Sequence, residues 1–405
     1  MSPGAPAGSP APAPVPAPVP GAGRADAAPV PGTVRRLRVT HLTTTHDAFD
    51  TRVFRKECRS LAEEGHEVTV IVPHDAGTVR DGVRIVAVPR PGSRAWRALV
   101  TTWQVFRAAR ALRPHVAHVH DPELLPQALL LALLGARVVY DAHEHLPRDV
   151  SAKHYLPVPL RGLLALLVDG LERAACAFLA GVVTVTPGIA ARFPRGRTVV
   201  VRNLPLLAEF PVRSSVPLAA RRPVALYLGG LNAIRGAREM VRAIGRVDAS
   251  LGAELWLAGR FDPPALEREL AREPGWARTR HLGWCPRERV LELLAEARVG
   301  LLTLQPAPNH LDSLPIKMFE YMAAGLPVVA SRFAAWEPYL AGAGVLVDPR
   351  DPDAIARAIE RLLAQPDEAQ ALGNAGRAAI VAGLHWEREA VTLLDLYARL
   401  AERAR

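Results

Sequence analysis

Short apolar runs alternate with amphipathic stretches along almost the whole chain. The first run covers residues 37–42, and a polar stretch follows it. A helical pattern through Phe54, Cys58 and Leu61 then leads to a second apolar run at residues 68–72. This spacing predicts one strand-helix-strand unit. Because parallel strands need a long crossover between them, the alternation favours a parallel sheet.

The same alternation continues as far as residue 205 and predicts a first α/β domain. Further strands are expected at residues 84–88, 116–119, 138–140, 182–185 and 198–201, and helices at residues 95–112, 122–134 and 160–180. Ligands of such sheets bind beyond the carboxyl ends of the strands.

A second α/β series follows a proline-rich stretch. Prolines at positions 205, 211, 217 and 223, with few periodic apolar residues between them, indicate a linker. Strands are then expected at residues 225–228, 255–258, 299–302, 328–330 and 344–347, and helices at residues 239–246, 287–297, 315–324 and 351–364. We therefore expect two doubly wound domains facing each other across a cleft, the natural active site.

The expected boundaries follow from these patterns. Residues 1–33 are a Pro/Ala/Gly tract that cannot bury a core and should be a disordered tail. Residues 34–205 form the first domain, residues 206–222 the linker and residues 223–385 the second domain. Residues 386–405 should form a helix that packs back toward the first domain.

Composition narrows the class of protein. Hydrophobic residues make up 49% of the 405 residues and charged residues 22%, which is ordinary for a globular protein. The longest uncharged apolar run, residues 124–135, is too short to span a bilayer, and the N-terminus lacks the apolar segment of a secretory signal. We expect a cytoplasmic protein, with the inner face of the cell membrane as a further option.

The net charge and the cysteines narrow the class of protein less than the composition does. The formal net charge is +10, which favours phosphorylated substrates, anionic headgroups or nucleic acid without choosing among them. The three cysteines, Cys58, Cys176 and Cys285, have neither metal-ligand nor redox spacing and are expected to be plain thiols.

Residues 312–331, DSLPIKMFEYMAAGLPVVAS, carry the most informative pattern. Pro315 suits the start of a helix, and the free N–H groups of that first turn together with Lys317 favour an anion. Asp312 lies just before the helix and Glu320 lies inside it, so the two carboxylates could face different ends of one ligand. A capped structural helix with two solvated acids is the alternative interpretation.

This segment resembles the retaining glycosyltransferases of family 4, which have the GT-B fold of two Rossmann-like domains and use nucleotide sugars. Their Glu-x7-Glu motif precedes a small-residue turn and a valine-rich strand, as Asp312, seven residues and Glu320 do here. The resemblance also covers DTRVFRKECRSLAEEGHEVTVIV, YLGGLNAIRG, HLGWCPRERVLELLAEARVGLLTL and HWEREAVTLLDLYARL. It implies that Glu320 holds the donor ribose and that Asp312, one methylene shorter than Glu, contacts the transferred sugar.

The resemblance also assigns a diphosphate site to the loop after the first strand of the second domain. In the text LGGLNAIRG, Gly229 and Gly230 allow close approach of the backbone to a phosphate, and Arg235 stands where the family has a basic residue. We expect Arg235 and Lys317 to clamp the diphosphate. Arg260 is a further donor-side candidate, and Gly283 with Trp284 resembles the loop near the nucleotide base.

Two polar clusters follow strands of the first domain. The text HVHDP holds His118, His120 and Asp121, and it resembles the family segment whose second histidine, here His120, contacts the transferred sugar. Asp121, together with His143 and Glu144 after the next strand, is expected on the acceptor side. No role follows from the sequence for Asp50 or Arg52.

The sequence thus predicts transfer of a sugar from a nucleoside diphosphate sugar to a hydroxyl acceptor, which is a carbohydrate, a lipid-linked molecule or a small molecule, with retention of configuration. No cofactor or metal is expected, because no Asp-x-Asp motif stands in a suitable loop. The alternatives are a nucleotide-sugar epimerase of similar fold and a non-catalytic basic protein. Scattered arginines and only 5% aromatic residues disfavour nucleic-acid binding.

Contact with a membrane surface is a compatible expectation. The expected helix at residues 160–180 should pack inside its domain. In the alternative, an apolar stripe and nearby cations lie on anionic lipid: Leu160, Leu163, Leu164, Leu167, Arg148, Lys153 and Arg161.

Overall fold

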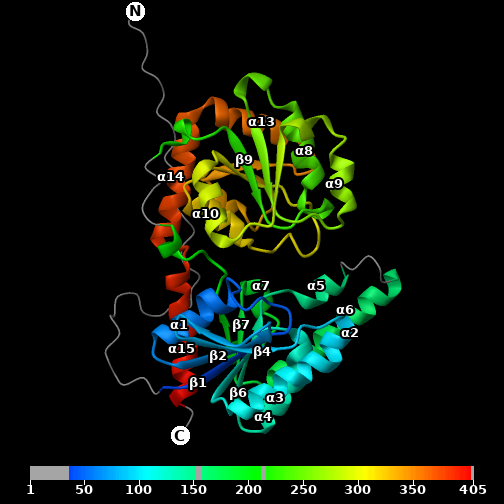
Figure 1. The fold of residues 1–405 in the computed structure, drawn as a ribbon, viewed down its shortest axis with the longest axis vertical. Coiled ribbons are helices and arrows are strands. Elements are labelled where there is room, and N and C mark those ends of the chain that lie inside the picture. Colours follow the sequence, from blue (N-terminus) through cyan, green and yellow to red (C-terminus); the bar gives the residue numbers. More distant parts are fainter. Residues whose placement is uncertain (1–35, 152–156, 211–215, 403–405) are drawn as a thin grey trace, which may run out of the picture. The chain divides into compact units, whose positions relative to one another are not determined.

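The computed structural model describes residues 36–151, 157–210 and 216–402. The predicted tail, residues 1–33, and Lys153 lie outside the described residues. The chain divides into two compact units (Figure 1). The N-terminal unit runs to Leu206 and also contains Ala307–Leu314 and the stretch from His385 onward, whereas the C-terminal unit contains Leu207–Pro306 and Pro315–Leu384.

The N-terminal unit is built on an eight-stranded sheet of order β3-β4-β2-β1-β5-β6-β7-β8, in which only β3 runs antiparallel to its neighbour. Its strands are β1 (Arg38–Leu42), β2 (Glu67–Pro73), β3 (Thr78–Arg80), β4 (Val83–Val88), β5 (Val116–Val119), β6 (Arg137–Ala142), β7 (Gly181–Thr184) and β8 (Thr198–Val200). Parallel pairing leaves the carboxyl ends of its central strands at one edge.

Helices cover both faces of this sheet. They are the wide helical turn η1 (Val53–Cys58), α1 (Arg59–Glu63), α2 (Arg94–Trp96), α3 (Thr102–Leu112), α4 (Leu125–Leu133), α5 (Leu146–Ser151), α6 (Val158–Ala177), α7 (Pro187–Ala190) and α15 (Trp386–Glu402). One core joins the sheet to η1, α1 and α15, and the other joins it to α3, α4 and α6 (Figure 1).

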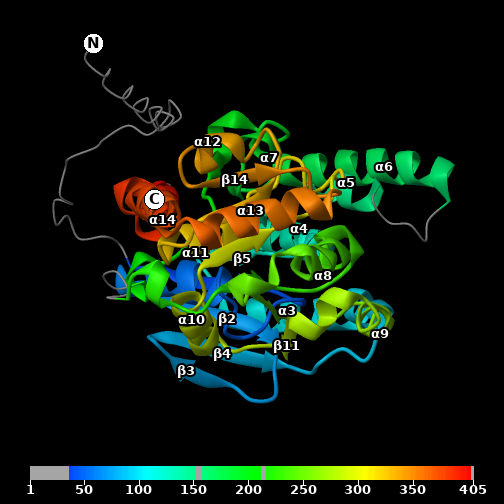
Figure 2. The same cartoon turned by 90° about the horizontal axis from the view of Figure 1, so that it is seen from above.

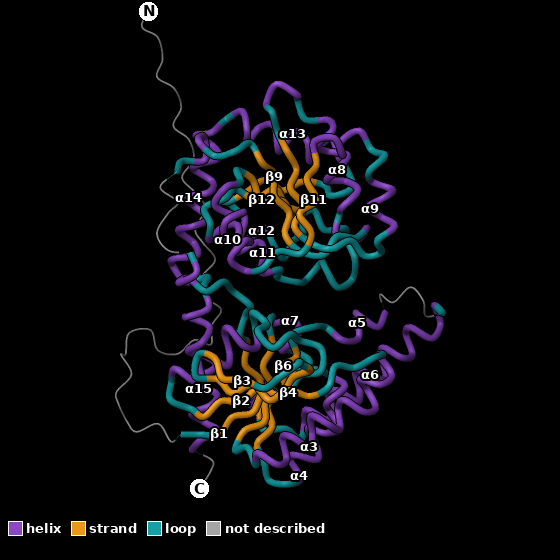
Figure 3. The backbone as a smooth tube through the Cα atoms, viewed as in Figure 1, coloured by secondary structure: helices purple, strands orange, loops and turns teal. Residues whose placement is uncertain are grey.

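The C-terminal unit has a six-stranded, all-parallel sheet of order β11-β10-β9-β12-β13-β14. The strands are β9 (Val224–Leu228), β10 (Glu254–Ala258), β11 (Thr279–Gly283), β12 (Val299–Leu302), β13 (Val328–Ser331) and β14 (Gly344–Val347). Figure 3 shows these strands enclosed by helices. Both units therefore have the predicted doubly wound α/β fold.

The helices of this unit pack on the sheet and on one another. They are α8 (Ala237–Arg246), α9 (Ala265–Leu270), α10 (Arg287–Glu296), α11 (Ile316–Ala323), α12 (Glu337–Leu340), α13 (Pro352–Ala364) and α14 (Pro366–Gly383). Helix α11 lies on β12 and β13, and α14 contacts both α11 and α13 (Figure 2).

Most expected elements are present, with ends shifted by one or two residues. The edge strands β3 and β11 were not predicted, because few of their side chains are fully buried and the apolar pattern is weak. Helix α14 was also missed. The expectation that residues 160–180 pack inside the domain is confirmed only in part. Cys176 and Leu179 lie in the core, whereas Leu160, Leu163 and Leu167 of α6 are exposed, and Leu166 and Leu171 are about 70% exposed (69% and 71%).

None of the helices in the described part of the chain combines the length and the apolarity needed to cross a bilayer.

Candidate active site

The glycine loop after β9 brings two cations together, as the sequence predicted. Gly229 has a φ of +111°, and a Cβ built there would lie 2.6 Å from Nζ of Lys317 on α11. A Cβ at Gly230 would lie 2.9 Å from Nη1 of Arg235. The two glycines thus leave room for both cationic side chains against the backbone. A methyl group at either position would occupy space that these side chains now fill.

Local structure fixes both cations. Nζ of Lys317 donates to the hydroxyl of Tyr227 at 3.1 Å and lies 4.3 Å from the centroid of its ring. The N–H of Arg235 donates to the side chain of Asn232 at 3.0 Å, and its Nη1 donates to the Gly230 carbonyl at 3.4 Å. Gly236 follows with a φ of +76° and begins α8.

The two cations repel each other. Burial of the Lys317 amine, with the neighbouring charge of Arg235 as the second cause, lowers its pKa to about 7. A pair of partly desolvated like charges is stabilised by an anion placed between them. The loop is therefore suited to a phosphate or diphosphate group.

Glu320, the predicted ribose-binding residue, is buried on α11. Its Oε1 accepts a hydrogen bond from Nη1 of Arg287 at 2.5 Å, and the same guanidinium donates to Glu209 at 2.5 and 3.0 Å. Arg287 thus joins two carboxylates and holds Glu320 in place. Sequence reasoning did not single out Arg287 or Glu209.

Asp312 belongs to the other compact unit. It lies in the short segment Ala307–Leu314, is 63% exposed and accepts a hydrogen bond from Arg148 of α5. The described structure does not bring it into the same unit as Glu320. Its predicted contact with the transferred sugar stays a prediction.

Two other donor-side candidates lie at carboxyl ends of strands in the C-terminal unit. Arg260 is exposed and follows β10 and Gly259. Trp284 is 64% exposed and follows Gly283, the last residue of β11, which has a φ of +67°. Both positions fit the rule that ligands bind beyond the strand ends of an open parallel sheet.

In the N-terminal unit, three histidines share one face of the sheet. Strands β1 and β5 pair so that His41 lies opposite His118, and His120 is two residues further along the chain. Because side chains alternate between faces, all three imidazoles lie together. Their ring centroids are 4.7 to 5.1 Å apart and each side chain is fully buried. Burial lowers the pKa of all three, which favours the neutral form of each ring.

His120 has both ring nitrogens occupied. Nε2 lies 2.9 Å from Nδ1 of His41, and Nδ1 lies 3.3 Å from Oδ2 of Asp141. Arg52 donates to the same carboxylate, from Nε at 2.8 Å and from Nη2 at 3.0 Å. His120 therefore sits under the surface rather than on it, and its contact with a sugar stays a prediction.

Asp121 is buried in a loop of threonines. Its Oδ2 accepts from the hydroxyl of Thr43 at 2.8 Å and from the N–H of Thr44 at 2.6 Å, and its Oδ1 accepts from the hydroxyl of Thr45. These donors stabilise the ionised form. Despite burial, which raises it, the pKa of Asp121 is held low by His46 and the threonines. The carboxylate anchors the loop that carries His46.

His143 and Glu144 are the accessible members of the N-terminal group. Both follow β6, with His143 partly exposed and Glu144 exposed. The His143 ring lies 5.3 Å from that of His46, which itself packs edge-on to His120. His46 and His143 thus form a partly exposed layer over the buried histidines.

Three polar residues of this centre were missed from the sequence: His41, Glu57 and Tyr397. Asp141 precedes His143 and Glu144 in the cluster that was expected on the acceptor side. Arg52 stood out in the text but had no derivable role, and the structure gives it the Asp141 ion pair. A sequence pattern does not reveal strand register, which brings these residues together. Asp141 of β6 lies on the same face of the sheet as His118 of β5 and His120, which follows that strand.

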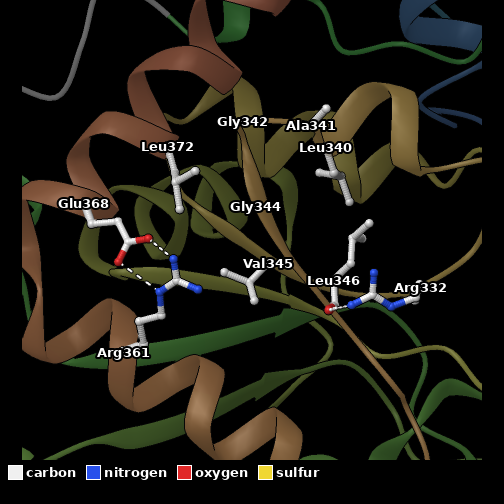
Figure 4. A pocket seen from close by; sticks show the side chains of 10 residues that line it. All are labelled: Arg332, Leu340, Ala341, Gly342, Gly344, Val345, Leu346, Arg361, Glu368 and Leu372. Atoms are coloured by element: carbon white, nitrogen blue, oxygen red, sulfur yellow. Dashed lines mark hydrogen bonds and ion pairs between the residues drawn. The ribbon is translucent and has the colours of Figure 1, made fainter. Parts of the chain in front are cut away.

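A shallow hollow on the C-terminal unit lies apart from these residues. It is lined by residues of β14, α12, α13 and α14 (Figure 4). Its Arg361 is paired with Glu368 and its Arg332 donates to the Leu346 carbonyl at 2.8 Å. Both arginines therefore already have partners. None of the predicted site residues lines the hollow.

Two doubly wound units, with paired cations after the first strand of the second unit, are the arrangement expected for the GT-B class of glycosyltransferase. A family model described as "Glycosyltransferase Family 4" matches residues 51–203, and one described as "Glycosyl transferases group 1" matches residues 222–365. The chain belongs to this family of glycosyltransferases.

Characterised relatives resemble the chain over most of its length. The MMP alpha-(1->4)-mannosyltransferase of Mycolicibacterium hassiacum is 26% identical over 414 residues, which cover 91% of this chain and 99% of the relative. A glycogen synthase of Mycobacterium tuberculosis is 26% identical over 379 residues, 84% of this chain and 88% of the relative.

Solved structures agree on the fold. A sucrose-phosphate synthase from Thermosynechococcus elongatus superposes with a TM-score of 0.72 at 20% identity, covering 91% of this chain and all (100%) of that one. The Anabaena protein HepE in complex with UDP and glucose gives a TM-score of 0.69 at 13% identity, covering 90% of this chain and 100% of that chain.

Proposed function

We propose that this glycosyltransferase takes its sugar from a nucleoside diphosphate donor whose diphosphate binds the loop after β9. The supporting observation is the convergence of Arg235 and Lys317 on Gly229 and Gly230. The two glycines let an anion approach the backbone, and the two cations compensate its charge. The complex of HepE with UDP and glucose supports a nucleotide donor for a protein of this fold.

The other donor-side roles follow from position. Glu320 accepts from the ribose hydroxyls, and Arg287, which donates to Oε1 of Glu320, orients it. Arg260 adds a third positive charge at the strand ends. Trp284 and Gly283 line the nucleotide base. Substitution of each residue tests its role, because a lost contact should lower the affinity for the donor.

The sugar-side and acceptor-side roles rest on the family motif. Asp312 and His120 act on the transferred sugar, and Asp121, His143 and Glu144 lie on the acceptor side. His143 and Glu144 can touch an acceptor directly because they are accessible. Asp121 acts through the threonine loop that it anchors.

The reaction retains configuration and needs no metal at the diphosphate. The bond from the anomeric carbon to the phosphate oxygen breaks, and the acceptor oxygen bonds to the same face of that carbon. The proton of the acceptor hydroxyl passes to the departing phosphate oxygen. Arg235, Lys317 and the N-terminus of α11 stabilise the charge that develops on that oxygen.

The acceptor is a carbohydrate, a lipid-linked molecule or a small molecule. A lipid-linked acceptor would place the enzyme at the inner face of the cell membrane. The exposed leucines of α6 support contact with a bilayer, and Arg161 lies beside them. Apolar side chains insert while cations attract anionic headgroups. Co-sedimentation with anionic vesicles is expected, and it should fall for Leu163→Asp with Leu167→Asp. Equal binding to neutral and anionic vesicles would contradict the electrostatic part.

The decisive test of the donor proposal is a thermal-shift and calorimetric screen of the full chain with UDP, GDP, dTDP and ADP and their sugars. One nucleotide should raise the melting temperature without added metal. Glu320→Ala and Lys317→Met should abolish that shift, and Arg357→Gln, an exposed arginine of the same unit, should keep it. No shift with any nucleotide would refute the proposal.

A further inference from the structure

The glycine loop after β9 is held by a second loop of the C-terminal unit, which follows β10. The N–H of Gly229 donates to the Ala258 carbonyl at 2.8 Å, and the N–H of Leu231 donates to the Arg260 carbonyl at 2.9 Å. A Cβ built at Gly259 would lie only 1.9 Å from the carbonyl oxygen of Gly229. Backbone therefore packs directly on backbone here, and the position of Gly259 sets the position of Gly229.

Strand pairing alone does not fix this second loop. Leu257 of β10 pairs with His281 of β11, but Ala258 pairs with Gly283, so the register shifts where β10 ends. Such an irregularity leaves one residue unpaired and disrupts the ladder locally. Gly259 follows directly, and another contact has to orient it.

The side chain of His281 supplies that contact. Its Nε2 lies 2.8 Å from the carbonyl oxygen of Gly259, and its Nδ1 lies 2.6 Å from Oε1 of Glu267 on α9. Because a backbone carbonyl only accepts, Nε2 carries the proton that it donates. Nδ1 and the carboxylate oxygen share a second proton, since two lone pairs facing each other at this distance would repel. Both ring nitrogens are thus held by partners on different elements.

Phe261 strengthens the same support. Its ring is buried and packs nearly edge-on against the His281 ring, with 4.8 Å between the centroids. Its backbone bridges to Leu231, and the next N–H, that of Asp262, donates to the Leu231 carbonyl at 2.8 Å. Contacts therefore lead from α9 through His281 to the second loop and on to the glycine loop.

From these contacts we infer that His281 and Glu267 are positioning residues of the donor site. His281 holds the Gly259 carbonyl, and Glu267 holds His281. Through Gly259 the pair keeps Gly229 in its conformation with a φ of +111°, which leaves room for Lys317. A loop fixed in advance loses less entropy when an anion binds. The effect on binding rests on the proposed donor function, whereas the effect on loop conformation does not.

The first test contains no nucleotide. Hydrogen exchange, read residue by residue by mass spectrometry, compares the full-length parent with His281→Phe, which keeps a flat ring but cannot donate. The amides of Gly229 and Leu231 should exchange ~3–10-fold faster in the variant, the change that loss of one hydrogen bond produces. Amides of the buried strand β9 should exchange as in the parent.

Nucleotide affinity is the second readout. Calorimetry uses whichever of UDP, GDP, dTDP and ADP stabilises the parent, and His281→Phe should bind it ~3–10-fold more weakly. His281→Gln should retain most of the affinity, because its amide N–H can replace that of Nε2. His281→Asn, whose amide lies where Nδ1 was, should behave like His281→Phe. A purely structural role would not produce this order.

Arg242→Gln is the matched control. Arg242 of α8 is exposed and donates to Glu273, just after α9, at 2.9 Å, so the variant loosens the surroundings of α9 without touching Gly259. Exchange at Gly229 and Leu231 and the nucleotide affinity should both stay as in the parent.

Unchanged exchange at Gly229 and Leu231 in His281→Phe would overturn the inference, whatever the nucleotide does. Faster exchange with unchanged affinity would overturn the role in binding. A parent that binds no nucleotide refutes the donor proposal instead, and the exchange result still decides whether His281 holds the loop. If His281→Phe does not fold, Glu267→Ala replaces it: Glu267 is only partly buried, and the same amides should again exchange faster.

Discussion

At the scale of single residues, Lys317 shows how its neighbours alter a side chain. An exposed lysine keeps its charge throughout the physiological range. Here, burial and the guanidinium of Arg235 lower the pKa to about 7. The free protein therefore holds a largely neutral amine above pH 7, and an anion bound between the two cations would favour the charged form again.

This linkage predicts proton uptake on nucleotide binding. Between pH 8 and 9, binding of the preferred nucleoside diphosphate should take up as much as ~1 proton per chain, because the bound anion raises the pKa of Lys317. Below pH 6 the amine is already charged and uptake at this site should vanish. Calorimetry in buffers of different ionisation enthalpy measures the number of protons.

Lys317→Met serves as the control, since it removes the titrating group. The variant should bind more weakly and show no uptake from this site at pH 8–9. A parent protein that binds nucleotide without any proton uptake in that range would contradict the assignment.

The buried ion pair of Arg52 and Asp141 is a second example of a side chain that depends on its neighbours. Arg52→Leu would leave Asp141 and Glu57 buried without their guanidinium. Breaking a buried ion pair by removing one partner costs ~3–5 kcal/mol, so the free energy of unfolding should fall by that amount. Urea denaturation of the protein measures it.

An exposed pair provides the comparison. Arg222→Leu removes a surface contact with Glu254 at 3.4 Å, and such pairs contribute only ~0–1 kcal/mol. Equal losses in the two variants would show that the Arg52 pair is not the buried anchor described here.

At the scale of elements, the glycine loop joins β9 to α8 and places the cations. Gly229 combines a φ of +111° with a close approach of Lys317. A side chain there is disfavoured by the backbone conformation and by the amine that occupies its space. Loop conformation and donor binding are thus coupled.

Gly229→Ala should therefore weaken nucleotide binding at least ~10-fold, since a strain of ~1–2 kcal/mol and a displaced Lys317 act together. Gly252→Ala is the control, because its φ of +59° imposes similar strain but a Cβ would meet nothing within 4 Å. It should lower stability slightly and leave affinity unchanged. Calorimetric titration compares the two, and equal affinities would contradict the coupling.

The elements also show what the sequence can predict. Buried parallel strands such as β5 and β12 are short runs of apolar residues, so they were found from local pattern alone. The glycine loop and α11 were also found, because turn and helix-start residues act locally. Lys317 and Glu320 were placed on this helix from the local pattern, whereas Arg235 was singled out through the resemblance to the family.

Non-local structure was not predictable in the same way. The pairing of His41 with His118 joins strands far apart in the sequence, and it depends on strand order and register. Edge strands carry little apolar pattern, so β3 escaped detection. The ion pairs of Arg287 and Arg52 likewise depend on packing between distant elements.

At the scale of the whole molecule, each compact unit is assembled from separate stretches of the chain. Helix α15 belongs to the N-terminal unit, although it is the last element in the sequence. It buries Trp386, Leu393 and Tyr397 against residues of β1 and η1. The Tyr397 hydroxyl also lies 2.9 Å from Nδ1 of His118. The N-terminal unit therefore needs the C-terminal end of the described chain.

Deletion of residues 385–405 should consequently unfold the N-terminal unit. Each large apolar side chain buried by α15 contributes ~1.5–3 kcal/mol, and several together match the ~5–15 kcal/mol stability of a typical domain. Hydrogen exchange measured by mass spectrometry should show loss of protection in β1, β2 and β5. The C-terminal unit should keep its protection and still bind nucleotide. Neither its sheet nor the proposed diphosphate-binding loop after β9 contains a residue of α15.

Point variants separate packing from chain length. Leu393→Ala removes a fully buried side chain and should cost ~2–5 kcal/mol, whereas Val391→Ala changes an exposed one and should stay within ~0.5 kcal/mol. A truncated chain that keeps full protection in the first sheet would show that α15 is dispensable. Loss of protection in both units would instead show that they fold as one cooperative body, since an unfolded first unit then could not leave the second intact.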